Sequence, residues 1–173
     1  ARVVDGVDAL RKAVREEFQM GADQIKIMAS GGVASPTDPV GAFGYSEDEI
    51  RAVTAEAAGR GTYVMAHAYT PAAIERAVRC GVRTIEHGNL VDAWAAQAMA
   101  TLVTYEALAN EGAQLGLPPE SVAKIADVKD AGLRALEILK TAGVKIGFGT
   151  DLLGESHRLQ SDEFRIRAQV LSN

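Results

Sequence analysis

The sequence has little cysteine and few aromatic residues. Cys80 is the single thiol among 173 residues, and aromatic side chains make up 5% of the chain. One cysteine excludes a disulfide framework, and no cysteine or histidine stands at zinc-finger spacing from it. Because the sequence offers Cys80 no obvious activating base, we expect a small buried apolar residue and not a catalytic thiol.

Long apolar runs and blocks of like charge are also missing. No stretch approaches the roughly 18 apolar residues of a membrane span, and residues 1–5 lack the apolar core of a signal peptide. The 18 basic and 23 acidic residues are interspersed and give a net charge of -5, so no surface for polyanions is indicated. We therefore expect no nucleic-acid or membrane partner. The location stays open, with the cytoplasm favoured, because a signal segment could precede residue 1 in a longer natural chain.

Hydrophobic residues make up 47% of the chain, which is enough for a packed core in one domain over residues 1–173. Short β-type runs alternate with longer amphipathic helical stretches, the pattern of repeated βα units around a parallel sheet. The sequence predicts five strands, over residues 24–28, 62–66, 82–86, 101–105 and 144–149.

Capping residues mark several predicted helix ends. Ser46 and Glu49 form a capping box that starts a helix reaching about residue 60, and Thr70 with Pro71 is an N-cap followed by a first-turn proline. The other helices are expected over residues 5–20 and 90–100, in a long region broken near 117–120 and ending at 142, and from residue 159.

The chain is too short for a complete (β/α)₈ barrel, which typically needs about 250 residues. Two architectures therefore stay open on length alone: part of such a barrel, or an open doubly wound sheet. In both, reactive groups collect at the carboxyl ends of the parallel strands, so the residues at those ends are the ones to examine.

Four of the five predicted strands carry, or end in, a residue able to bind or support a metal ion. Lys26 lies on the first strand, His67 and His87 follow the next two, and Asp151 follows the last. Each alone has an ordinary structural explanation, such as a hydrogen-bonded histidine or an aspartate that caps a turn. Chance placement explains the set of four poorly.

Lys26 stands between Ile25 and Ile27 on a strand that is expected to be buried, where an ammonium group carries a large desolvation cost. Two chemistries relieve that cost: a Schiff-base nucleophile, or a neutral amine that takes up carbon dioxide and bridges two metals as a carbamate. The neighbouring histidines favour the carbamate, because imidazole and carboxylate groups are suitable ligands for zinc.

At this point the sequence resembles a known family. The strings at residues 25–32, 66–68, 86–88 and 149–151 resemble the successive strand-end motifs of the amidohydrolase superfamily, in the same order. The most similar branch is related to imidazolonepropionase and includes Xaa-Pro dipeptidases and metallo-carboxypeptidases. The resemblance covers nearly the whole chain and implies an α/β fold: the later part of a (β/α)₈ TIM-barrel-like hydrolase, without the barrel start and the C-terminal segments.

The resemblance also implies an activity and a set of site residues. It implies a binuclear metal-dependent hydrolase of C–N bonds, a dipeptidase or carboxypeptidase using two divalent ions, expected to be zinc. Lys26 would be the carboxylated lysine that bridges both ions, His67 and His87 the ligands of the second ion, and Asp151 a ligand of the first and the proton shuttle. Tyr69 and Tyr105 are candidates to bind a small-molecule or dipeptide substrate through its carboxylate, with packing at the barrel rim as the structural alternative.

The sequence departs from the family pattern in two places. It contains no His-x-His pair, which ends the family's first strand, and the segment just before residue 101 is shorter than in the family. We therefore expect a chain that begins partway round the barrel. Two alternatives stay open: a metal-free (β/α) enzyme with Lys26 as Schiff-base nucleophile, and a non-catalytic piece whose open strand edges favour assembly with another chain, including a second copy.

Overall fold

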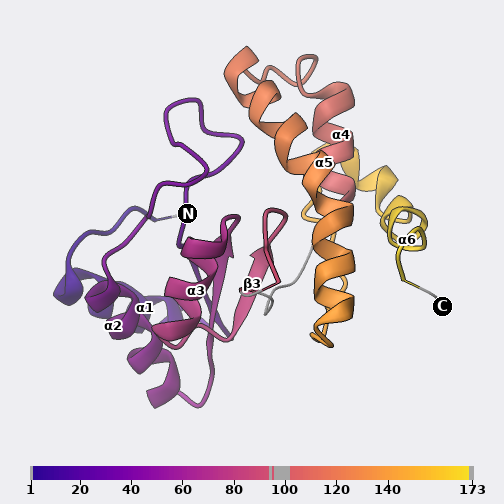
Figure 1. Ribbon diagram of the computed structural model, residues 1–173. Helices are drawn as coiled ribbons and strands as arrows, with labels where there is room; N and C mark the ends of the chain where they lie inside the picture. Colours follow the sequence, from indigo (N-terminus) through magenta and orange to yellow (C-terminus); the bar gives the residue numbers. More distant parts are fainter. Residues whose placement is uncertain (1, 94, 96–101, 172–173) are drawn as a thin grey trace.

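The computed structural model describes residues 2–93, 95 and 102–171. Figure 1 shows α1, α2 and α3 gathered on one side, with α4, α5 and α6 beyond β3. No helix within the described ranges is both long enough and apolar enough to cross a membrane. The elements are α1 (Val7–Gln19), β1 (Ile25–Met28), α2 (Glu47–Gly59), β2 (Val64–Ala68), α3 (Pro71–Arg79), β3 (Thr84–His87), α4 (Val103–Glu111), α5 (Pro119–Thr141), the 3₁₀ helix η1 (Gly154–Leu159) and α6 (Asp162–Arg167).

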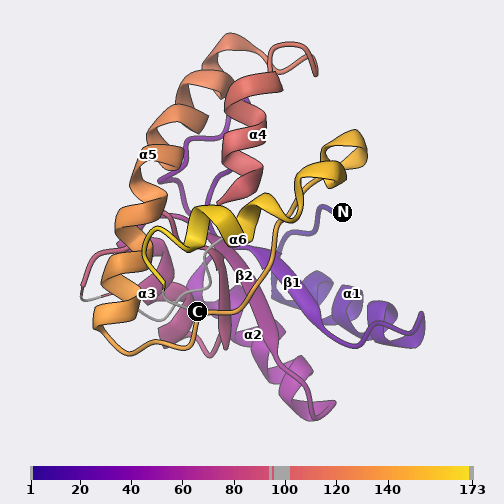
Figure 2. The ribbon, with the colours of Figure 1, turned by 90° about the vertical axis from the view of Figure 1, so that its right-hand side faces the viewer.

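The strands form one parallel sheet in the order β1-β2-β3, which confirms the predicted α/β class. Parallel neighbours need a crossover, and α2 and α3 supply the two crossovers. Figure 2 shows β1 and β2 running side by side. Ile27, Ala66 and Ile85 share one face and are buried in the main hydrophobic core, whereas Lys26 and Met65 point to the opposite, more open face.

The predicted helix starts are confirmed in atomic detail. The Ser46 hydroxyl accepts a hydrogen bond from the backbone N–H of Glu49, and the Glu49 carboxylate accepts one from the backbone N–H of Ser46. Thr70 caps α3 by accepting from the N–H of Ala73, with Pro71 in the first turn. These caps satisfy amide groups that have no partner inside the helix.

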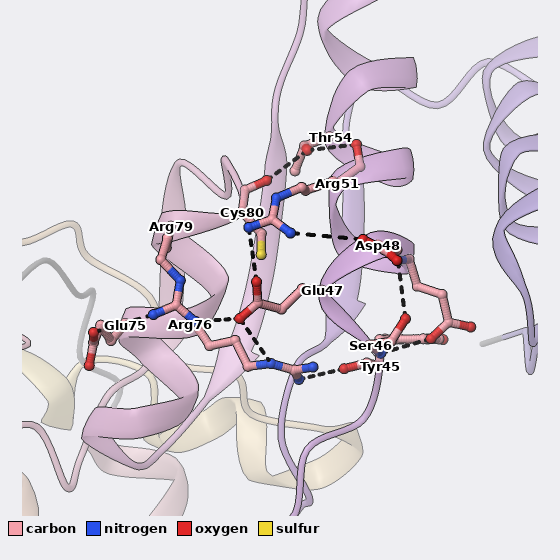
Figure 3. Close-up of polar contacts among 11 residues, drawn as sticks. Tyr45, Ser46, Glu47, Asp48, Arg51, Thr54, Glu75, Arg76, Arg79 and Cys80 are labelled. Carbon is pink, nitrogen blue, oxygen red and sulfur yellow. Dashed lines mark hydrogen bonds and ion pairs between the residues drawn. The ribbon is translucent and has the colours of Figure 1, made fainter.

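Glu47 cross-links the outer surfaces of α2 and α3 (Figure 3). Its carboxylate accepts hydrogen bonds from Arg51, at 2.9 Å, and from Arg79. Arg76 donates to the carbonyl of Tyr45 at 2.5 Å and so attaches the segment before α2 to α3. Because these side chains are partly exposed to water, each ion pair contributes little to stability, and the network mainly fixes how the two helices meet.

Two predicted strands are wrong. The segment from Val103 belongs to α4, and residues 144–149 pair with no strand in the described part of the chain. A strand needs a hydrogen-bonded neighbour. Because the first run is helical, it offers the second run no strand to pair with. Residue 101 of the first run lies outside the described residues. In the second, the Gly147 carbonyl accepts from Arg167 of α6 at 2.6 Å instead.

Two helix predictions also change. The helix expected over 90–100 falls mainly outside the described residues, and residues 90–93 and 95 are not helical. The helix expected from 159 begins at Asp162, after η1.

A buried ion pair connects α6 to the start of α4. Glu163 is fully buried, and its carboxylate accepts from Arg167 at 2.5 Å and from the backbone N–H of Leu102 at 3.0 Å. Arg167 is itself 7% exposed and also donates to Gly147. Both charges are therefore compensated, as buried charges must be.

Candidate active site

One cavity of about 690 Å³ lies at the carboxyl ends of the strands. Every site residue that the sequence predicted lines it: Lys26, His67, Tyr69, His87, Tyr105 and Asp151. They come from β1, β2, β3, α4 and the loops after β2 and before η1. The structure therefore brings together residues that lie up to 125 positions apart, the separation of Lys26 and Asp151 (151 − 26).

The backbone of His87 directs its ring into this cavity. Strand pairing sets His67 beside Glu86, and His87 beside Ala68, so regular alternation would turn His87 toward the helices. Instead His87 has a left-handed φ of 79°, and its ring centre lies 4.5 Å from that of His67. The two imidazoles therefore meet edge to face, although regular strand alternation would place them on opposite faces of the sheet.

The hydrogen bond of His67 determines which of its nitrogens is available. Its Nε2 lies 3.1 Å from the carbonyl oxygen of Gly31. A carbonyl only accepts, so Nε2 holds the proton and Nδ1 keeps its lone pair. Burial lowers the pKa of His67. Burial, with smaller contributions from the neighbouring His67 and Lys26, lowers the pKa of His87 to about 2. Both rings are neutral at pH 7, the form that binds metals.

The two tyrosines pack against the histidine rings and are buried, not exposed at a rim. Tyr69 and Tyr105 are each 2% exposed, and their hydroxyl oxygens are 2.9 Å apart. The Tyr105 hydroxyl also lies 2.8 Å from Nδ1 of His87. Burial raises the pKa of Tyr69 to about 12, so its hydroxyl stays protonated at neutral pH.

Lys26 lies in the cavity, but the expectation that its side chain is buried is wrong. Its side chain is exposed, because β1 lies at the edge of the sheet that the described residues form and Lys26 is on the open face of that sheet, while Ile25 and Ile27 are buried on the other face. An exposed ammonium group carries little desolvation cost. The role of Lys26 as a metal-bridging carbamate stays a prediction, supported by its place in the cavity and not by burial.

Asp151 faces the same cavity from the loop before η1. Its carboxylate Oδ2 is 4.0 Å from Nε2 of His87, and its side chain is half exposed. The Thr104 hydroxyl of α4 donates to the backbone carbonyl of Asp151 at 3.2 Å, which attaches this loop to α4. Asp151 also has a left-handed φ, of 51°.

Sequence reasoning missed the residues of α5 that hold one wall of the cavity. Lys124 donates to the backbone carbonyls of Ser35 and Asp38, both at 2.8 Å, and Ser121 donates to that of Ala34 at 3.1 Å. These partners are 86 to 89 residues apart, and the acceptors are backbone atoms. No local pattern in the sequence marks such contacts.

The donor atoms in the cavity suit a divalent ion of the zinc type. In the part of the chain that the structure describes, no three His, Cys, Asp or Glu side chains are grouped closely enough to hold a metal by themselves. Lys26, which is outside those four residue types but would be a metal ligand as a carbamate, also lines the cavity, and His67 offers a lone pair on Nδ1. Imidazole nitrogen and carboxylate oxygen are common zinc ligands, so the donor types fit.

These features define a parallel α/β protein whose candidate site lies at the carboxyl ends of its strands. The sequence profile of the amidohydrolase family matches residues 1–171, and the chain belongs to that family.

The chain is also similar to individual proteins of known name. It is 36% identical over 158 residues to an ochratoxinase of Aspergillus niger, covering 86% of this chain and 32% of that protein. Among solved structures, an amidohydrolase is 74% identical with a TM-score of 0.97 over 99% of this chain and 44% of its own. A prolidase complexed with N-methylphosphonate-L-proline is 66% identical, with a TM-score of 0.97 over 100% of this chain and 44% of its own. The chain thus spans about a third of the curated relatives and under half of these structures.

Proposed function

We propose that this chain carries the metal-binding and substrate-binding part of a hydrolase that cleaves the amide bond of a dipeptide or N-acyl amino acid. The observation that carries the proposal is the gathering of Lys26, His67, His87 and Asp151 around one cavity. Membership of the amidohydrolase family and similarity to a prolidase and an ochratoxinase support the reaction class.

The residues of this chain would form two metal sites with unequal numbers of ligands. Lys26 as a carbamate, His67 through Nδ1 and His87 through Nε2 would bind one ion, and Asp151 with the same carbamate would contribute to a second. When bound, divalent ions polarise the scissile carbonyl and favour ionisation of the attacking water at neutral pH. Because the sequence contains no His-x-His pair, we expect the site with the two histidines to bind zinc more tightly.

Asp151 is the residue we assign to proton transfer. Its half-exposed carboxylate borders the cavity, where it can accept a proton from the attacking water and return it to the leaving amine. Both transfers require hydrogen-bond contact with the reacting groups, and such a side chain typically contributes about 10²–10⁴-fold to the rate.

Tyr69 is the residue we assign to the substrate carboxylate. It lines the cavity, and its hydroxyl remains a donor at neutral pH because burial raises its pKa to about 12. Val33, Leu108 and Leu117 line the same cavity and would suit an apolar side chain such as proline.

Metal content tests the proposal first. The purified chain, loaded with zinc and then dialysed, should retain at least one zinc per polypeptide by elemental analysis, and His67→Ala should lose most of it. No retained zinc, or unchanged zinc in His67→Ala, would contradict the assignment. Borohydride trapping with a carbonyl substrate would then test Lys26 as a Schiff-base nucleophile.

Hydrolysis of an Xaa-Pro dipeptide by the zinc-loaded chain tests the reaction. Asp151→Asn should reduce the rate by about 10²-fold or more, because the asparagine amide cannot accept a proton from the attacking water and transfer it to the leaving amine. Asp130→Asn, at an exposed position of α5, is the matched control and should retain the full rate.

A further inference from the structure

Tyr105 contacts the ring nitrogen of His87 that points away from Asp151. Its hydroxyl lies 2.8 Å from Nδ1, while Nε2 on the other side of the ring lies 4.0 Å from the Asp151 carboxylate. The hydroxyl of Tyr69 is a further 2.9 Å from that of Tyr105. Both tyrosines are almost fully buried, so these contacts lie within a packed part of the protein.

The direction of the hydrogen bond between Tyr105 and His87 decides which nitrogen can bind a metal. A neutral imidazole has one ring proton, and the nitrogen that holds it has no lone pair to offer. If Nδ1–H donates to Tyr105, the lone pair stays on Nε2, on the side of Asp151. If Tyr105 donates to Nδ1, the proton is on Nε2 and metal binding there is blocked.

We propose that Tyr105 is a positioning residue that accepts the Nδ1–H of His87 and so keeps the lone pair on Nε2, the nitrogen that would bind a metal together with Lys26 and His67. This inference rests on the proposed function, because His87 needs a lone pair on Nε2 only where that nitrogen binds a metal. Tyr105 then donates its own hydroxyl hydrogen to the oxygen of Tyr69. Tyr69 lines the cavity, and its own hydroxyl hydrogen is not used in the contact with Tyr105. The three side chains form one directed hydrogen-bond chain.

The two histidines are therefore held by different means. His67 has a backbone carbonyl, that of Gly31, as its partner, and a carbonyl allows only one tautomer. His87 has a side-chain hydroxyl, which allows both tautomers and can be removed by Tyr105→Phe with little change in shape. Partners of this kind typically account for about 10–100-fold in metal affinity.

Long-range ¹H–¹⁵N NMR of the histidine-labelled chain reads the tautomers directly. The chain has three histidines, so single variants suffice to assign the signals. The unaltered chain without added metal should show His87 protonated on Nδ1 and His67 on Nε2. Tyr105→Phe should give His87 a substantial Nε2-protonated fraction, leave His67 unchanged, and weaken zinc binding roughly 10–100-fold.

Tyr63→Phe is the matched control, since its ring stacks with Arg83 outside the cavity, and it should alter neither reading. Protonation of His87 on Nε2 in the unaltered chain would overturn the inference, and that spectrum needs no variant to fold. Unchanged zinc affinity in a folded Tyr105→Phe would also overturn it and leave the proposed function standing. If the unaltered chain binds no zinc, the proposed function fails, and the tautomers alone decide the role of Tyr105.

Discussion

Nε2 of His87 lies 4.0 Å from the carboxylate of Asp151, and both residues have a left-handed backbone, with φ of 79° and 51°. Among the described residues, these are the two that combine a positive φ with a side chain larger than glycine's. Such a conformation costs about 1–3 kcal/mol and persists only where surrounding structure maintains it, most often at functional sites. The strain supports the placement of the site on physical grounds that do not depend on family resemblance.

Replacing His87 with Asn should weaken zinc binding at least about ten-fold, because one imidazole ligand is lost. Asn tolerates a left-handed backbone better than most residues, so the turn should survive. Competition with a chromogenic chelator measures the affinity. His157→Asn is the control: that ring contacts the Leu152 carbonyl at 2.6 Å and should leave zinc binding unchanged. Equal affinity in both variants would remove His87 from the ligand set.

Glu163→Gln should lower the free energy of unfolding by about 3–5 kcal/mol, because it leaves the buried guanidinium of Arg167 without its counter-charge. Urea denaturation measures the change. Asp162→Asn removes an exposed ion pair with Arg165 on the same helix and should cost less than about 1 kcal/mol. If both variants lower the free energy of unfolding by a similar small amount, burial of the Glu163–Arg167 ion pair does not make it more important than the exposed pair.

Lys124→Met should accelerate amide exchange in residues 33–38 by roughly ten-fold or more. It removes two charge-assisted hydrogen bonds to the backbone of that segment, worth about 1.5–3 kcal/mol each. Exchange mass spectrometry measures it by peptide. Lys129→Met, at an exposed position of α5, should leave the segment unchanged. If Lys124→Met also raises KM more than it lowers kcat, this segment contributes to substrate binding.

Cys80 should be nearly inert to thiol reagents in the folded protein at pH 8 and react rapidly in denaturant. It is 3% exposed, and burial raises the pKa of its thiol. Because the folded pKa lies above the unfolded one, its contribution to stability is present below the unfolded thiol pKa and is lost as pH rises above it. Cys80→Ser should reduce that loss. Rapid labelling of the folded chain would show that the thiol is accessible.

Local signals in the sequence predicted most of the first half of the fold. The capping box at Ser46 and Glu49 and the Thr70-Pro71 start depend on neighbours within three residues, so a linear reading finds them. The three strands of the sheet were placed to within about two residues, because apolar runs between helices are also local. The strand predicted over 144–149 failed because pairing requires a partner elsewhere in the chain.

The sequence by itself determined the alternation of strands and helices, the parallel α/β class and which candidate residues stand at the strand ends, because these depend on periodicity and residue type. Only the tertiary structure decided that Lys26 is exposed on the open face of the sheet, that a left-handed turn directs His87 toward His67, and that α4 places Tyr105 against His87. Side-chain direction, burial and tautomer depend on contacts between segments that are far apart in the chain, and no local pattern encodes them.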